Sequence, residues 1–549
     1  MIKKHQQQFG DHIAKNILDI EHQEISKVYK RRILPKLFHR ELNKRELEVR
    51  ELQARSELNI RDPGFSHQWH ILNKRNKGND LNLLPVWERG LTGKGITVAF
   101  VDDGLDHLNE EFSYKYDPLA SYDFNTNSTD PIPKLGSDSH GTRCAGEVSA
   151  AKDNACGVGI AYNSKVSGIR ALSAPLYAHS EASALSYRND LNDIYSCSWG
   201  PQDDGQSIGE PSKIAQKSII NSITNGRQGR GNVYVFASGN GGLYKDNCNF
   251  DGYVNSIYTI AVGAIDRYNK IPKYSEGCSA LLLVTYSGDD NGRDTIFTTD
   301  VNGKCTSKHS GTSAAGPLIS GVVALALEAR PDLSWRDIQH LIIQNSVPVS
   351  LDHPSWATTY VGRPYSNMFG YGKMDASRFI DAAIHFQNVR PQTQIQIPTI
   401  EVDERIPETN DGLLTSIIVT PEMVNSNNFD TLEHVTIKVN IKHDRRRDVE
   451  MELISPNNIV SKVIESRPYD KSNEGFEDWT VMTVKHFDEP IVGEWKLKVK
   501  DIHHHNFKHG KFINYSIIFY GQSKPIIRYP SYSKLNRMSK IFNYFKDFL

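Results

Sequence analysis

The sequence predicts an α/β domain with a parallel sheet and helices on both faces, followed by a smaller all-β domain. In residues 59–390, short continuous apolar runs alternate with helical patterns, whereas in residues 391–522 apolar and polar residues alternate within each run. Buried parallel strands are apolar throughout, and strands with one solvent-facing side alternate. A chain of 549 residues is also too long for one core, which favours two or three domains.

Continuous apolar runs supply the strands of the first domain. They occupy residues 95–101, 165–172, 193–200, 232–240 and 256–265. Helical patterns such as 210–229 separate several of them. In a parallel sheet of this kind, ligands bind at the carboxyl ends of the strands. The polar residues that follow these runs are therefore the first candidates for a functional site.

Alternating runs separated by turn residues predict a sandwich or a barrel for the second domain. They occupy residues 434–443, 448–456, 478–484, 493–501 and 514–521. The three histidines at 503–505 fall in a turn, where solvated side chains are favoured over a zinc site. The basic and aromatic tail 523–549 is expected to be a disordered end rather than a helix on a membrane surface.

Residues 1–58 form a charged leader, and its basic pairs have two interpretations. Lys30, Arg31 and Arg32 stand together, as do Lys44 and Arg45. They belong either to solvated helices with charge pairs four residues apart, which is favoured for 44–55, or to exposed basic cleavage sites in a removable leader.

Charge and hydropathy give no sign of a nucleic-acid partner or of a segment that crosses a membrane. Lys and Arg number 64 against 65 Asp and Glu, so nothing indicates a nucleic-acid partner. The apolar run 318–329 is too short to cross a bilayer, and the first residues lack the apolar core of a secretion signal. Either the protein is cytosolic or the chain lacks its true start. The glycosylation triplets at Asn127 and Asn514 support a secretory address only weakly.

Polar residues at element ends predict nucleophilic catalysis. Asp102 ends an apolar strand, His140 begins a predicted helix, and Ser313 begins a long apolar helix behind Gly311. A serine hydroxyl needs a base such as histidine to take its proton, and a carboxylate on the far ring nitrogen orients that histidine. Asn240 ends another strand, where its amide could donate a hydrogen bond to an oxyanion.

Each of these residues also has a structural interpretation. Asp102 and Ser313 could cap helices, His140 could only begin one, and Asn240 could be a turn residue. The order Asp, His, Ser along the chain is one of the known orders of the catalytic triad. All four residues stand at element ends with glycine nearby, and this combination favours catalysis.

Longer motifs carry a family resemblance. "DDGLD", "HGTRCAG", "SCSWGPQDDG", "ASGNGG" and "SGTSAAGPL" resemble motifs of the kexin/furin group of subtilisin-like proprotein convertases. "LISP", "GFEDW" and "GEWKLKV" resemble the P domain of that group, so the resemblance covers about residues 60–521 and is greatest to fungal kexins. It implies a subtilisin-like fold with a P domain, and a calcium-dependent serine endoprotease that cuts precursor proteins after paired basic residues.

The resemblance assigns further roles. Asp102, His140 and Ser313 become the triad, and Asn240 becomes the oxyanion donor. A monomer of the secretory pathway is implied, in the Golgi or secreted, with membrane contact left open. The leader would inhibit and assist folding, and would be cut near Arg32 or Arg45. The alternatives are a subtilisin-like protease of broad specificity and a catalytically silent homologue that binds basic peptides.

Acidic residues near the strand ends suit a basic substrate, because a buried guanidinium needs carboxylates in place of its hydration shell. The alternative is that most of these loop acids are solvated surface residues. By resemblance, the pocket for P1, the residue before the scissile bond, contains Asp203 and Asp251 flanked by Trp199 and Gly200. The resemblance also places Asp103 in the P2 site and Glu181 and Tyr253 in the P4 site.

Two departures from the family pattern affect these sites. Ser137 stands where an acid is usual, and Asp138 is expected to compensate. Gly209 stands where a P4 acid is usual, with Glu210 beside it. We therefore expect a firm demand for P1 arginine, a preference for a basic P2 residue and a weaker demand at P4.

Calcium ligands are also implied by the resemblance, and oxygen-rich carboxylate clusters suit this ion. One site would use Asp203, Asp246 and Glu276. A second would use Asp62, Glu111 and the loop around Asn154, although Glu111 replaces the usual aspartate and that loop looks one residue shorter than in the family.

All six cysteines lie between Cys144 and Cys305, which suits two disulfides and two free thiols, with the pairing open from spacing alone. The resemblance pairs Cys156 with Cys305 and Cys248 with Cys278. Cys144 would then be a free thiol near His140, and a nucleophilic Cys144 is the alternative to Ser313.

Overall fold

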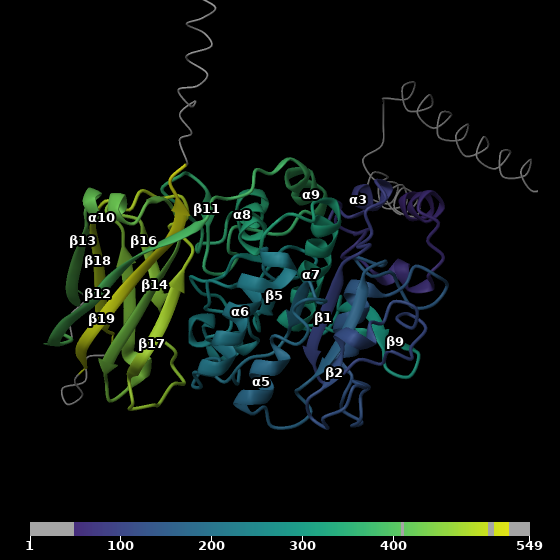
Figure 1. The fold of residues 1–549 in the computed structure, drawn as a ribbon, viewed down its shortest axis with the longest axis horizontal. Coiled ribbons are helices and arrows are strands. Elements are labelled where there is room, and N and C mark those ends of the chain that lie inside the picture. The colour runs from purple at the N-terminus through teal and green to yellow at the C-terminus, as the bar shows by residue number, and fades with distance from the viewer. Residues whose placement is uncertain (1–48, 408–410, 503–509, 526–549) are drawn as a thin grey trace, which may run out of the picture. The chain divides into compact units, whose positions relative to one another are not determined.

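The computed structural model describes residues 49–407, 411–502 and 510–525. The chain divides into two compact units, Met1–Ala54 and Arg55–Leu549. The second unit contains both an α/β region and a β-rich region (Figure 1). The basic residues at 30–32 and 44–45, the histidines at 503–505 and the tail beyond 525 lie outside the described residues.

The predicted parallel sheet is confirmed, and it has seven strands in the order β2-β3-β1-β4-β5-β6-β7. Every neighbouring pair in it is parallel. The strands are β1 Thr97–Asp102, β2 Tyr122–Asp123, β3 Lys165–Arg170, β4 Ile194–Cys197, β5 Val233–Ala237, β6 Thr259–Ile265 and β7 Leu283–Tyr286. The sequence interpretation missed β2, which has two residues, and β7, which follows β6 without an intervening helix.

Helices flank this sheet (Figure 1). They are α3 Leu84–Glu88, α4 His140–Ser149, α5 Ala178–Ala184, α6 Lys213–Gly229, α7 Thr312–Ala329, α8 Trp335–Asn345 and α9 Ala376–His385. Short 3₁₀ turns are η1 Pro63–His67, η2 Pro118–Ala120, η3 Gly241–Tyr244 and η4 Cys248–Phe250. Two small hairpins pair β8 Ile296–Asp300 with β9 Lys304–His309, and β10 Ala357–Thr358 with β11 Pro364–Tyr365.

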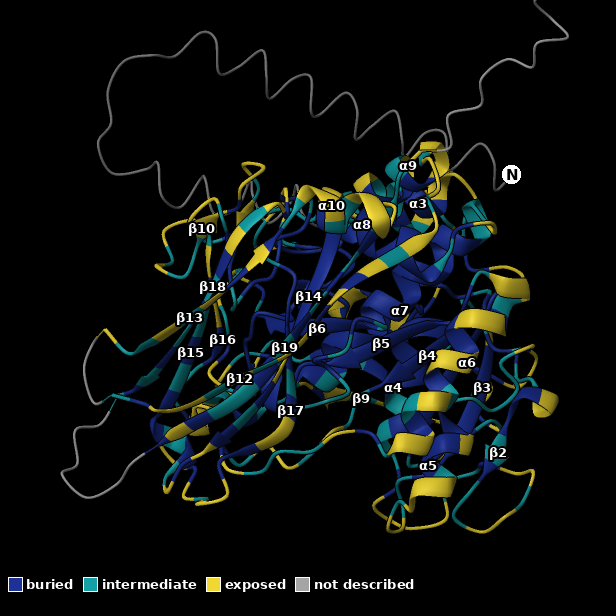
Figure 2. Cartoon of the chain, turned by 60° about the vertical axis from the view of Figure 1, so that its left-hand side comes forward, coloured by how far each residue is buried: buried dark blue, intermediate teal, exposed yellow. Residues whose placement is uncertain are grey.

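The apolar helix α7 is the core element of this region. It packs against β4, β5, β6 and β7, and its side chains are buried through most of its length (Figure 2). Within the described residues it is the one helix long and apolar enough to cross a membrane, but 83% of that stretch is buried inside the fold. Its hydrophobicity is therefore explained by packing against the sheet.

The β-domain, residues 392–523, is the predicted sandwich. One sheet has the order β12-β19-β14-β17 and the other β13-β18-β15-β16, and both are antiparallel. The strands are β12 Gln392–Arg405, β13 Leu413–Val419, β14 Phe429–Lys442, β15 Val449–Ile454, β16 Val460–Ile464, β17 Phe476–Thr483, β18 Gly493–Asp501 and β19 Lys511–Ser523, with α10 Pro421–Ser426 and η5 Arg446–Asp448 between strands. Inward-facing apolar residues of both sheets form its core.

Glu433 of β14 anchors the β-domain to the α/β region. Its carboxylate pairs with the Arg336 guanidinium and lies 2.7 Å from His340 Nε2, both on α8. All three side chains are buried. Burial by itself would raise the pKa of Glu433, but the bonds from His340 and the charge of Arg336 lower it to about 2.

Replacing Glu433 with Gln is therefore expected to lower the free energy of unfolding by about 3–5 kcal/mol, because it leaves the Arg336 charge buried without a counter-ion. Chemical unfolding at neutral pH measures the change. The matched control is Asp190→Asn, which breaks the exposed Arg188–Asp190 pair and is expected to cost at most about 1 kcal/mol.

The Glu433 pair also gives the sign of a pH effect. Because the pKa of Glu433 is lowered in the folded state, its contribution to the free energy of unfolding is present above the ordinary glutamate pKa and is lost as the pH falls through about 2.

In the mutation test, equal losses of stability in Glu433→Gln and Asp190→Asn would contradict the assignment of Glu433 as an anchor.

Candidate active site

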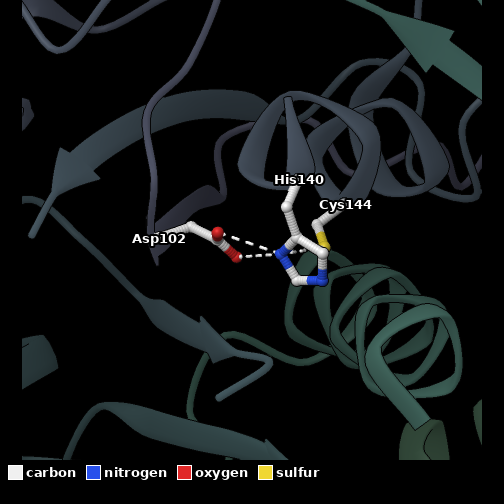
Figure 3. A group of neighbouring side chains, drawn as sticks. All are labelled: Asp102, His140 and Cys144. Carbon is white, nitrogen blue, oxygen red and sulfur yellow. Dashed lines mark hydrogen bonds and ion pairs between the residues drawn. The ribbon is translucent and has the colours of Figure 1, made fainter. Parts of the chain in front are cut away.

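Asp102 and His140 form an ion pair where β1 ends and α4 begins, with the carboxylate buried and the imidazole partly exposed. Both carboxylate oxygens lie 2.9 Å from His140 Nδ1 (Figure 3). Burial by itself would lower the pKa of His140, but the Asp102 charge, the neighbouring Cys144 and the hydrogen bonds to both residues together raise the pKa well above its usual range. The carboxylate also fixes the ring so that Nε2 is left for a reacting group.

Asp103 holds the first turn of α4 in place. Its carboxylate accepts hydrogen bonds from the backbone N–H groups of Ser139, His140 and Gly141 at 2.8–2.9 Å. These donors lie at the start of a helix, where they have no partner within the helix. Burial, with the Asp102 charge beside it, raises the pKa of Asp103 to about 6. The residue predicted to contact P2 therefore also positions the backbone of His140.

Ser313 lies in the first turn of α7, which brings it close to His140. Pro317, four residues later, has no N–H for the Ser313 carbonyl. That carbonyl instead accepts a hydrogen bond from the Ser198 hydroxyl at 3.1 Å and lies 3.6 Å from Cys144 Sγ. Cys144 Sγ is in turn 3.9 Å from His140 Nδ1. The structure thus brings Ser313 beside the His140–Asp102 pair through main-chain contacts, and within the described residues its hydroxyl makes no hydrogen bond to His140.

Asn240 is oriented by the same helix start. Its Oδ1 accepts hydrogen bonds from the Thr312 N–H at 2.8 Å and the Thr312 hydroxyl at 3.1 Å. The donor side of the amide is its NH₂ group, which also bonds to the Asp203 carboxylate and has a second hydrogen to donate. Gly311 makes this approach possible, because its φ of 82° is left-handed and a Cβ there would lie 2.9 Å from Asn240 Oδ1.

Four carboxylates surround one small cavity next to Asn240. Its volume of about 10 Å³ is of the order of a single water or ion. The acidic residues that line it are Asp203, Asp246, Asp251 and Glu276. Burial raises the pKa of Asp251 to about 7, and it raises that of Glu276 well above its usual range, with added repulsion from Asp246 and Asp203. This crowding of negative charge suits a cation.

The other residues predicted for P1 and P4 are connected to this cavity through Asp251, which also accepts the N–H of Tyr253 at 2.7 Å. Gly200 faces Asp251 so closely that a Cβ on it would be 2.3 Å from the carboxylate. The Trp199 and Tyr253 rings meet edge to face, with centroids 4.9 Å apart. Tyr253 donates its hydroxyl hydrogen to Glu181 at 2.6 Å.

Asp138 differs from the predicted substrate contact. It forms a buried ion pair with Arg170 at 2.9 Å and accepts the N–H of Leu135 at 3.1 Å. Only 4% of the residue is exposed. Burial by itself would raise the pKa of Asp138, but the hydrogen bond from Arg170 lowers it. Its carboxylate is therefore occupied within the protein and does not replace the acid that is missing at Ser137.

A second acidic cluster contains Asp62, Glu111 and Asp153. Asp62 Oδ1 accepts the N–H of Asp153 at 3.0 Å, and Glu111 Oε2 accepts the N–H of Ala151 at 2.8 Å. Asp62 Oδ2 and Glu111 Oε1 are buried and have no hydrogen-bond partner within the described residues. Burial raises the pKa of Glu111 to about 8, and the charge of Asp153 adds to this.

The sequence interpretation named Asn154 for this cluster. Asn154 is exposed, and the structure instead places its neighbour Asp153 against Asp62 and Glu111. Two orphaned carboxylate oxygens are what a hard cation would satisfy.

Both disulfide pairings are confirmed. Cys156 is bonded to Cys305 with Cα atoms 5.5 Å apart, and Cys248 to Cys278 at 5.3 Å. Cys144 and Cys197 are free and buried. Burial raises the pKa of the Cys144 thiol to about 11, which disfavours the thiolate and therefore the interpretation of Cys144 as the nucleophile.

Comparisons with known proteins agree with this geometry. The family model described as "Subtilase family" matches residues 93–372, and the one described as "Proprotein convertase P-domain" matches residues 432–519. A solved serine protease of Aeromonas sobria, bound to its chaperone, has a TM-score of 0.75 at 21% identity over 85% of this chain and 96% of its own, and supports the fold.

Curated relatives are similar over most of the chain. A dibasic-processing endoprotease of Schizosaccharomyces pombe is 48% identical over 85% of this chain and 66% of its own length. Kexin of Saccharomyces cerevisiae is 46% identical over 82% of this chain and 55% of its own length. Proprotein convertase subtilisin/kexin type 7 of Homo sapiens is 39% identical over 85% of this chain and 61% of its own length. The chain therefore spans two thirds or less of the length of these relatives.

The resemblance to the kexin/furin group is confirmed by these matches. The chain belongs to the subtilase family and carries a proprotein convertase P-domain, which is the β-domain described above.

Proposed function

We propose that this protein is a calcium-dependent serine endoprotease that hydrolyses peptide bonds after paired basic residues in precursor proteins. The observation that carries the proposal is that the start of α7 connects the Asp102–His140 pair, through Asn240, to a cavity lined by four carboxylates. The pair supplies the base of a serine protease, and the carboxylates supply the charge that a basic P1 side chain requires.

The chemistry follows from the positions of these groups. Ser313 Oγ attacks the scissile carbonyl while His140 Nε2 takes its proton, and Asp102 stabilises the resulting imidazolium. The Asn240 amide donates to the oxyanion, since its oxygen is already bonded to Thr312. His140 then returns the proton to the leaving amine. Water repeats the sequence on the acyl-enzyme.

Two carboxylate clusters suit calcium, with Asp203, Asp246 and Glu276 in one and Asp62, Glu111 and Asp153 in the other. Their support is the crowding of the first cluster and the orphaned oxygens of the second. Bound calcium would offset the repulsion among these acids and hold their loops rigid.

The remaining roles are extended from the relatives. A dibasic-processing endoprotease and kexins at 43–48% identity support precursor proteins as the substrates. The same likeness supports a place in the secretory pathway and a leader that inhibits until it is cut near Arg32 or Arg45. We extend it also to a monomeric state, with a weaker demand at P4 than at P1.

Ser313→Ala is expected to reduce kcat for a Lys-Arg peptide by about 10⁶-fold, because no other group in the site can form the acyl-enzyme. A fluorogenic peptide assay measures it. The matched control is Ser307→Ala, an exposed serine on β9, which is expected to leave kcat unchanged. Retained cleavage by the Ser313 variant would remove this residue from its role, and lack of cleavage by the unaltered protein would favour a basic-peptide binder.

Specificity for P1 is tested with two peptides that differ only by arginine or citrulline at P1. Citrulline keeps the shape and loses the charge, so it leaves Asp203 and Asp251 without a partner, and kcat/KM is expected to fall by at least about 10²-fold. Comparable cleavage of both peptides would instead indicate a protease of broad specificity.

Glu111→Gln is expected to weaken calcium binding by about tenfold, because it removes one of the charged ligands of the second cluster. The measurement is the calcium concentration at the midpoint of the rise in Tm. Glu110→Gln, the exposed neighbour, is the control and is expected to keep the midpoint. An unchanged midpoint in both variants would contradict the second calcium site.

A further inference from the structure

We propose that Arg467 of the P domain is a positioning residue for the P1 pocket: its guanidinium holds the loop that carries Asp203 and pairs with Asp246. The inference rests on the proposed function, since it names a part of the chain outside the α/β region that sets the geometry of the specificity pocket.

Arg467 is buried at the border of the P domain and the α/β region. It is 1% exposed, and its guanidinium carbon lies 3.8 Å from the centre of the Phe250 ring. Nη1 is 3.0 Å from Asp246 Oδ1, and Nη2 is 2.5 Å from Asp470 Oδ2. A guanidinium this deeply buried is stable only when its donors are satisfied. Two of its partners are carboxylates on either side of the domain border.

The same guanidinium holds a loop of the α/β region. Nη1 donates to the carbonyl of Ser207 at 2.7 Å, and Nη2 donates to the carbonyl of Gln206 at 3.0 Å. Arg446 donates to that Gln206 carbonyl at 2.7 Å and pairs with Asp470 at 2.6 Å. Arg446, Arg467 and Asp470 therefore form one clamp on residues 206–207.

The other side of this loop carries the P1 acid. Asp246 Oδ2 accepts the N–H of Gly205 at 2.8 Å, so Asp246 joins the loop to Arg467. Asp203 Oδ2 accepts the N–H of Asn240 at 3.0 Å. Hydrogen bonds from the P domain therefore fix residues 205–207, and the backbone of this loop leads two residues further to Asp203, which holds the N–H of Asn240.

Charge gives Arg467 a second effect. Within the described part of the chain, it is the one basic side chain paired with any of the four cavity carboxylates. Its positive charge therefore offsets the repulsion among Asp203, Asp246, Asp251 and Glu276 when no ion is bound. Loss of that charge would make the cluster depend more heavily on an added cation.

Arg336 provides the matched comparison. It also pairs with a buried carboxylate across the domain border, that of Glu433, but its partners are Glu433 and the Arg390 carbonyl rather than residues of the 203–207 loop. A general weakening of the domain border would affect both arginines alike. Only Arg467 is expected to affect the P1 pocket.

The experiment compares Arg467→Gln with Arg336→Gln in the full chain, with two readouts. The first is Tm with calcium and with a chelator: for Arg467→Gln the drop is expected to be larger in chelator by about 5 °C, whereas Arg336→Gln loses equally in both. The second is kcat/KM for P1-arginine and P1-lysine peptides. The Arg467 variant is expected to lose about 10-fold or more on P1 arginine and to discriminate less between the two.

Arg446→Gln covers the case in which Arg467→Gln does not fold, because it removes one bond to the Gln206 carbonyl and leaves Arg467 in place. It is expected to show both effects at a smaller size. Equal Tm losses with and without calcium, together with unchanged discrimination, would overturn the proposal. The Tm readout needs no cleavage, so it tests Arg467 even if the protein does not cut dibasic peptides.

Discussion

Burial of several carboxylates at the carboxyl edge of the parallel sheet is the constraint on which the rest of the site depends. A buried carboxylate is stable only with hydrogen bonds or a counter-charge. Asp102 has His140, Asp103 has the N–H groups at the start of α4, and Asp251 has the N–H groups of Tyr253 and Val254. These partners fix where helices and loops begin, so the charge pattern also sets the backbone geometry.

The P domain enters through the same constraint. The acids of the cavity are crowded. Within the described residues, the α/β region gives them backbone N–H groups as partners but no basic side chain. Arg467 comes from the P domain, 221 residues after its partner Asp246. The Glu433–Arg336 ion pair has the opposite arrangement: the acid comes from the P domain and the arginine from the α/β region. Each region therefore neutralises buried charge in the other across their border.

The sequence predicted the parts of the site that lie at the ends of regular elements. Asp102, His140 and Ser313 follow apolar runs or begin helices, so hydrophobic periodicity located them. It did not locate Arg467, which stands between β16 and β17, where the pairing partner is distant along the chain. Residue type also did not predict which carboxylates are left for substrate or metal. Asp138 forms an ion pair with Arg170, and Asp153 rather than Asn154 contacts Asp62.

Selectivity and stability are linked by these acids. Without a cation, the cavity holds Asp203, Asp251 and Glu276 close together, and burial raises the pKa of each. Any cation that binds the folded state and not the unfolded one stabilises the fold in proportion to its affinity. In the proposed function, calcium takes Asp203, Asp246 and Glu276, and a P1 guanidinium faces Asp203 and Asp251, which a neutral side chain of the same shape would leave without a counter-charge. Repulsion among the acids that disfavours the empty pocket would therefore also contribute to the distinction between arginine and its neutral analogue.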